Sequence, residues 1–287
     1  MKDLRVRYRI YGAIFKGFCF SANVLAFGFL LYLLGSVLFQ GVPNINWTFL
    51  TEYPSRFPQK AGILAAIAGT VWMMVLTAFV SIPLGIGAAI YLEEYARPGR
   101  LVNLVRLNIQ NLAGVPSIIY GMLGLTMIVR GLGLGRSILA GALTMALLIL
   151  PVITIATQEA LRAVPGSLRL AGFGIGMTRW QVVRYQVFPS ALPGIMTGII
   201  LALSRAVGES APLLLVGATA YSAYLPSSPM DGFTVLSVQI YNWIDQPQKE
   251  FQALAAGAIV ILLVLLIALN SIAIYLRQYY RKKVSTG

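Results

Sequence analysis

The chain has 287 residues, of which 58% are hydrophobic and only 11% are charged. Soluble domains carry about 25% charged residues, so this composition excludes an ordinary soluble domain and indicates one integral membrane domain. The sequence contains no histidine and no G-x4-G-K-[ST] motif, which excludes His-based metal sites, Ser-His or Cys-His catalysis, and ATP binding by a P-loop.

Six apolar windows are each long enough to cross a bilayer, which takes about 20 helical residues. They are residues 18–39, 62–92, 107–129, 138–157, 191–216 and 253–276. The second window is long enough that it must tilt, bend at Pro83, or project out of the lipid. The predicted fold is therefore all-α, with six transmembrane helices in one domain over residues 18–276 and short tails at residues 1–17 and 277–287.

The basic residues predict the orientation of these helices. Six spans place both tails on one side of the membrane, and the tails and links on that side hold 16 of the 22 Lys and Arg, against 5 on the other. Lys and Arg accumulate on the cytoplasmic side of membrane proteins, so we expect both termini to be cytoplasmic. The net charge of +13 is then a signature of topology and does not indicate nucleic-acid binding.

Two adjacent carboxylates, Glu93 and Glu94, end the second window. We interpret them as solvated surface or as a contact with a partner protein rather than as an acid–base pair.

Residues 158–190 form the longest predicted cytoplasmic loop, and a loop of this length usually has a function. The stretch from Ser167 to Phe173 suits a short amphipathic helix that Gly174 and Gly176 would end. Thr178 is a suitable N-cap for a second helix. The alternative to a functional loop is an amphipathic helix that lies on the lipid surface.

Arg205 and Glu209 are the only ionisable residues of the fifth window. A charge at the centre of a membrane span costs roughly 2.5–3.5 kcal/mol unless it is paired or faces water. The two residues are four apart and share one helix face. Gly208 removes a side chain beside them, Ser210 offers a hydroxyl, and we expect Pro212 to disrupt the backbone one turn later. The pair therefore borders a substrate pathway, or else locks this chain to a partner subunit.

The loop resembles the EAA loop of ABC-importer permeases, which forms the coupling helix that docks into a cytoplasmic ATPase. Leu170-Ala171-Gly172 falls on the E-A-A of that pattern, with Leu170 in place of the acid, and Gly176 and Pro189 match its glycine and its final proline. The resemblance implies a coupling role for the following residues: Glu159, Ala160, Leu170, Ala171, Gly172, Gly176 and Pro189.

Three further stretches resemble the phosphate-importer permeases of this class. They are LAGVPSIIYG at residues 112–121, AAIYLEEY at 88–95, and SRAVGESAPL at 204–213, and the last is closer to the PstA branch than to PstC. The resemblance implies a MetI-like type I permease fold in a prokaryotic inner membrane. Ser117 and Tyr120 in the first stretch either line the path or pack between helices.

By the same resemblance, the chain is one half of a heterodimeric phosphate pathway. The implied partners are a PstC-like permease, two copies of a PstB-like ATPase, and a PstS-like phosphate-binding protein outside. An Arg fork can hold a phosphate oxyanion bidentately, and a nearby carboxylate can accept its O–H or weaken the grip so that the anion leaves.

The residues leave two other functions open. One is a permease of the same class for another oxyanion or small solute, and the other is a stand-alone secondary transporter or membrane enzyme. We expect no cofactor and no metal in this chain, and ATP hydrolysis in a separate partner.

Overall fold

The computed structural model describes residues 2–218 and 222–285, and in these ranges the regular structure is helical throughout. The long helices are α1 (Lys2–Gly41), α3 (Leu64–Ile90), α6 (Ile138–Arg162), α9 (Phe188–Gly208) and α12 (Lys249–Ser285). The shorter ones are α2 (Trp47–Thr51), α4 (Arg100–Ala113), α5 (Ser117–Leu123), α7 (Gly166–Gly174), α8 (Arg179–Val182), α10 (Ala211–Val216) and α11 (Leu236–Ile244). Three π-helical turns continue longer helices, namely η3 (Tyr91–Tyr95), η4 (Gly124–Gly131) and η5 (Val183–Val187). Two 3-10 turns, η1 (Val42–Asn44) and η2 (Pro58–Lys60), flank α2.

Among the residues that the structure describes, five helices are long and apolar enough to cross a membrane, or six if one bent pair counts as a single span. The bent pair is α4 with α5–η4, and its two halves meet at 106°. The window at residues 107–129, expected as one of the six spans, is therefore sharply bent. The bend lies at Gly114–Pro116, where a residue that precedes proline is pushed out of the helical region. In contrast, α3 continues as a helix through Pro83.

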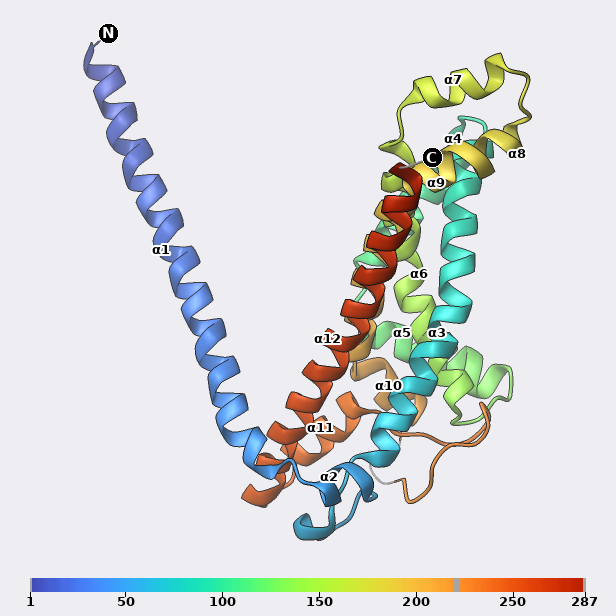
Figure 1. The fold of residues 1–287 in the computed structure, drawn as a ribbon. Coiled ribbons are helices and arrows are strands. Elements are labelled where there is room, and N and C mark those ends of the chain that lie inside the picture. The colour runs from blue at the N-terminus through green and yellow to red at the C-terminus, as the bar shows by residue number, and fades with distance from the viewer. Residues whose placement is uncertain (1, 219–221, 286–287) are drawn as a thin grey trace.

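Figure 1 shows how the helices are arranged. The C-terminal end of α12, the start of α1 and helices α7 and α8 lie toward one end of the molecule, which we call the α7 end. Helices α2 and α11 lie at the opposite end, the α2 end. Helix α1 leaves the bundle at an angle and meets it only near its last residues, where a Cβ at Gly41 would fall 2.5 Å from the Ala256 carbonyl oxygen. The predicted tails at 1–17 and 277–287 are largely continuations of α1 and α12.

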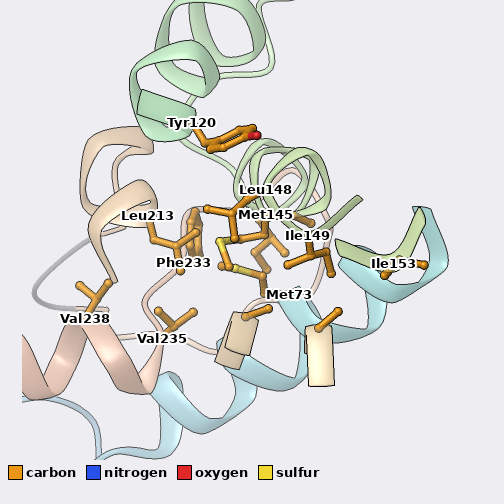
Figure 2. Close-up of a cluster of buried hydrophobic side chains, with 14 residues drawn as sticks. Met73, Tyr120, Met145, Leu148, Ile149, Ile153, Leu213, Phe233, Val235 and Val238 are labelled. Carbon is orange, nitrogen blue, oxygen red and sulfur yellow. The ribbon is translucent and has the colours of Figure 1, made fainter. Parts of the chain in front are cut away.

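Helix α6 is the central helix of the bundle, with two thirds of its apolar window buried. Its residues Met145 and Ile149 pack with Met73 of α3, Leu213 of α10 and Phe233 in the largest buried cluster. Figure 2 shows this cluster, in which the side chains of α3, α6, α10 and the segment before α11 converge. Helix α6 thereby fixes the position of α10, which follows the Arg205–Glu209 pair.

Helices α6 and α9 cross through small residues. Ala160 of α6 faces Gly194 of α9, where an added Cβ would lie 2.9 Å from the alanine methyl, and Ala156 faces Gly198 still more closely. Small residues at such a crossing allow two membrane helices to approach until their backbones touch. The α6–α9 crossing joins the helix that enters the 158–190 loop to the helix that carries Arg205.

Candidate functional site

Arg205 and Glu209 form an ion pair at a break between α9 and α10. The Arg205 Nε lies 3.3 Å from the Glu209 Oε1. Helix α9 ends at Gly208, and Glu209 has extended backbone angles of φ −76° and ψ 126°. The Arg205 side chain is 49% exposed and that of Glu209 is 19% exposed, so within this chain the pair faces open space rather than a dry core.

The helix is disrupted before Pro212 and not at Pro212, where the sequence had suggested a break. The non-helical residues are Glu209 and Ser210, and Pro212 stands in the first turn of α10. Proline is favoured there because its missing N–H would have no partner in the first turn of a helix. The prediction that Pro212 itself breaks the helix is therefore wrong, although the break is present two residues before it.

The backbone groups at the break are hydrogen-bonded within the chain. The Ser237 Oγ on α11 donates to the Glu209 carbonyl at 3.1 Å, and the Ser210 carbonyl accepts from the Leu213 and Leu214 amides at 3.1 and 3.0 Å. A broken helix in a membrane is tolerated where such partners or a wet cavity satisfy its backbone. Helix α11 therefore holds the break in place from the α2 end.

Helix α5 packs against the other side of the break. A Cβ at Gly121 would lie 2.7 Å from the Pro212 Cα, so the two backbones touch. The Tyr120 hydroxyl donates to the Leu112 carbonyl across the α4–α5 bend at 2.8 Å, and its ring lies at the edge of the buried cluster (Figure 2).

The predicted pathway residues thus fall into two groups. Arg205, Gly208, Glu209 and Ser210 lie together at the break, and a Cβ at Gly208 would meet nothing within 4 Å. Tyr120 is 5% exposed and engaged in packing, while Ser117 begins α5 and is half-buried. Their role in a pathway stays a prediction.

A crevice of about 250 Å³ lies elsewhere on α9 and does not include the ion pair. It runs between α3, α9 and α12, and apolar side chains such as Leu203 and Leu269 form nearly all of its wall. We do not assign it to an anion because a phosphate would lose its hydration there without gaining polar partners.

The 158–190 loop contains one separate helix, α7, as the sequence predicted. Gly176 follows it with φ +82°, a conformation that favours glycine. Thr178 caps α8 in a capping box with Gln181. The second helix is not isolated, because α8 continues through η5 into α9, a run of 30 residues.

The predicted coupling residues occupy different environments. Glu159 and Ala160 belong to the end of α6 rather than to a loop, and Pro189 stands in the first turn of α9. Leu170 and Ala171 are exposed on α7, whereas Gly172 is buried and a Cβ there would lie 2.8 Å from Val182. Glycine at 172 therefore lets α7 approach α8.

Of the two environments expected for Glu93 and Glu94, solvated surface is wrong, and contact with a partner protein stays a prediction. Glu94 is 9% exposed and its Oε1 lies 2.6 Å from the Arg169 Nη2 of α7. Glu93 pairs with Arg162 at 2.7 Å and with Arg106 at 3.3 Å. The sequence contained an indication of these ion pairs, since these arginines and both carboxylates fall in links predicted on the same side of the membrane.

The family described as "Binding-protein-dependent transport system inner membrane component" matches residues 81–286. Among similar proteins, the "Phosphate transport system permease protein PstA" of Xylella fastidiosa is 34% identical over 85% of each chain. PstA 1 of Mycobacterium tuberculosis is 33% identical over 96% of this chain and 91% of its own. The "Probable ABC transporter permease protein YqgI" of Bacillus subtilis is 31% identical over 90% and 92%.

Two solved structures have the same fold. A chain of a bacterial alginate ABC transporter superposes with a TM-score of 0.67 over 95% of this chain and 94% of its own, at 15% identity. A chain of the MetNI methionine ABC transporter in an inward-facing conformation superposes with a TM-score of 0.59 over 74% and 93%, at 20% identity. The chain therefore belongs to the family of binding-protein-dependent transport system inner membrane components, and has the fold of ABC importer permeases.

Proposed function

We propose that this chain is the PstA-like permease subunit of an ATP-driven phosphate importer. In this proposal it forms half of the translocation pathway with a PstC-like permease. Two PstB-like ATPase subunits dock at the α7 end, and a PstS-like protein delivers phosphate at the α2 end. Support comes from the phosphate transport relatives that match along nearly the whole chain and from the chemistry of the helix break.

The observation that carries the proposal is the half-exposed Arg205 held beside Glu209 at the break. Phosphate near neutral pH is an anion that a guanidinium fork binds through two hydrogen bonds. The carboxylate at 3.3 Å from the guanidinium competes for the same positive charge. It therefore weakens the binding of phosphate, as a transit site requires.

The α7 end would face the cytoplasm, because the tails and links there carry the excess of Lys and Arg. The large exposed side chains on α7 are apolar, and Leu170 and Phe173 are 73% and 47% exposed. Leu170 stands where the family pattern has an acid, so we infer that α7 binds its ATPase through apolar contacts rather than through that charge.

The test of the pathway role is the variant Arg205→Gln in the reconstituted complex. We expect ATP-dependent phosphate uptake to fall at least about tenfold, since a charged hydrogen-bond partner of the anion is worth about 1.5–3 kcal/mol. The matched control is Arg130→Gln, an exposed arginine at the end of η4, which should leave uptake unchanged. Unchanged uptake in Arg205→Gln would refute the site.

The same variant distinguishes a pathway from a subunit lock. If Arg205 lines the pathway, the PstC-like partner should still co-purify with the variant although uptake is lost. If Arg205 locks the subunits together, the partner should be lost along with uptake. Uptake in competition with other oxyanions then tests the substrate, and purification of the chain with no ATPase attached would favour a stand-alone transporter.

The coupling role is tested at Gly176, where φ is +82°. Gly176→Val forces a β-branched side chain into a left-handed conformation that such residues avoid, and should displace the turn after α7. ATP hydrolysis should then continue with little phosphate uptake. Gly99→Ala is the control, because its φ of −176° suits any residue and an added Cβ would meet only one atom, at 3.8 Å. Normal coupling in Gly176→Val would contradict the assignment of the loop.

A further inference from the structure

The π-helical turn η3 at the end of α3 contacts four helices at the α7 end. A π turn leaves some backbone carbonyls without their usual helical partners, and such turns often occur at functional sites. Here the Arg106 Nη2 of α4 donates to the Leu92 carbonyl at 2.7 Å. Helix α4 is thereby attached to the turn through the backbone.

Glu93 attaches the turn to the end of α6. The Arg162 fork donates to both carboxylate oxygens, from Nη2 to Oε1 at 2.7 Å and from Nε to Oε2 at 3.1 Å. Arg106 approaches the same carboxylate at 3.3 Å. The Glu93 side chain is only 11% exposed, and bidentate arginine–carboxylate pairs are rigid as well as strong.

Glu94 attaches the turn to α7. The Arg169 Nη2 lies 2.6 Å from the Glu94 Oε1, and Arg169 also donates to the carbonyls of Val164 at 2.9 Å and Leu161 at 3.0 Å. Arg169 is therefore held at three points, one on η3, one in the last turn of α6 and one directly after α6. A displacement of α7 must either move these points with it or break several charged hydrogen bonds.

Tyr95 completes the set of contacts. The Arg179 guanidinium of α8 lies over its ring, 5.6 Å from the centroid, within the range of a cation–π contact. Residues 92–95 of one turn thus contact α4, α6, α7 and α8 in succession.

We propose that η3 is the relay that passes movement of α7 to α3 and α4, with Glu94 and Arg169 as its positioning residues. This inference rests on the proposed function, since it takes α7 as the helix on which an ATPase acts. The relay explains why two carboxylates are buried at a membrane boundary, where each would be costly without its arginine partner.

The variants that test the relay are Glu94→Gln and Arg169→Gln, with the double variant. Glutamine keeps the size of the Glu94 side chain while it removes the charge, and at Arg169 it removes the guanidinium and shortens the side chain. The matched controls are Glu52→Gln and Arg100→Gln, which are exposed and lie outside the contacts described above. Arg169→Lys keeps the charge but loses the planar fork, so it should give an intermediate effect.

The first measurement uses the chain alone in detergent. Spin labels at Leu84→Cys on α3 and Ile175→Cys after α7, both exposed positions, are introduced in a Cys19→Ser background. We expect the distance distribution between them to broaden in Glu94→Gln and to stay unchanged in Glu52→Gln. An unchanged distribution in Glu94→Gln would overturn the relay.

The second measurement is the number of phosphate ions imported per ATP hydrolysed by the reconstituted complex. We expect this ratio to fall at least about fivefold in Glu94→Gln, the lower end of the usual range of coupling between linked sites. The double variant should be no worse than the poorer single variant, because both residues act through one contact. A broadened distance with an unchanged ratio would also overturn the relay, since η3 would then be only a local clamp.

The two proposals fail in different ways. If the unmutated complex imports no phosphate on ATP addition, the proposed function is wrong whatever the spin labels show. If import is normal and Glu94→Gln matches Glu52→Gln in both measurements, the relay is wrong and the proposed function stands.

Discussion

The contact between α5 and α10 allows a sharp test of the geometry at the helix break. A Cβ at Gly121 would lie 2.7 Å from the Pro212 Cα and 3.0 Å from the Pro212 carbonyl oxygen. Ordinary carbon contacts begin near 3.4 Å. Because both opposing atoms belong to the backbone, no side-chain rotation can relieve the overlap, and the two helices must move apart.

We expect Gly121→Val to destabilise the chain by about 2–3 kcal/mol, the upper part of the range for overpacking a close contact. Valine is a better helix former than glycine by only about 0.3 kcal/mol, which offsets little of this loss. At about 2–4 °C for each kcal/mol in a chain of this size, the midpoint of thermal unfolding in detergent should fall by about 4–12 °C.

The control is Gly87→Val on α3, where an added Cβ would meet nothing within 4 Å. Its unfolding midpoint should stay within about 2 °C of the unmutated chain, in keeping with surface substitutions. A second variant, Gly121→Val with Leu215→Ala, removes the one side chain near the site and should not restore stability. Equal midpoints for Gly121→Val and Gly87→Val would refute the backbone contact between α5 and α10.

Two further predictions concern the α2 end. The Asp231 carboxylate accepts hydrogen bonds from the Ser227 amide, the Ser228 amide and the Ser227 hydroxyl, which hold its pKa below the ordinary value of 3.8. Its stabilising effect is therefore present above pH 3.8 and lost as pH falls through the lowered pKa. The protection of residues 226–231 from hydrogen exchange, taken relative to the intrinsic rate at each pH, should therefore fall in acid more in the unmutated chain than in Asp231→Asn; equal changes would contradict this. Ser237→Ala removes the donor to the Glu209 carbonyl and should lower the free energy of unfolding by about 0.5–1.5 kcal/mol. In the control Ser190→Ala, the lost hydroxyl bonded within its own helix, so the loss should be smaller when both are measured by thermal unfolding in detergent. Equal losses would exclude a stabilising role for Ser237.

Local patterns made much of the fold predictable. Long apolar windows indicate membrane helices because the bilayer demands about 20 apolar residues in succession. The bend at Gly114–Pro116 was not predicted in this way because apolar residues such as Val115 and Ile118 continue across it. Hydropathy does not report the angle between two consecutive helical segments. The turn after α7 was predictable because Gly174, Gly176 and Thr178 determine the backbone conformation and the helix cap at their own positions in the chain.

At the site, too, contacts between residues close in sequence were predictable and contacts between distant residues were not. Arg205 and Glu209 are four residues apart, so their pairing follows from helix geometry. The hydroxyl of Ser237 reaches Glu209 from 28 residues away, and Arg169 reaches Glu94 from 75 residues away. Contacts of this kind depend on how helices pack, and one sequence without its fold does not specify which of several arginines meets which carboxylate.

The small-residue crossing of α6 and α9 has a mechanical consequence. Ala156 and Ala160 meet Gly198 and Gly194 without an intervening layer of side chains, so there is nothing between the two main chains that can reorder and absorb a displacement. We therefore expect the two helices to translate or tilt together as one rigid unit. From Gly194 to Arg205, α9 extends about 16 Å at 1.5 Å per residue, so we expect a displacement of the crossing to move the part of α9 that carries Arg205.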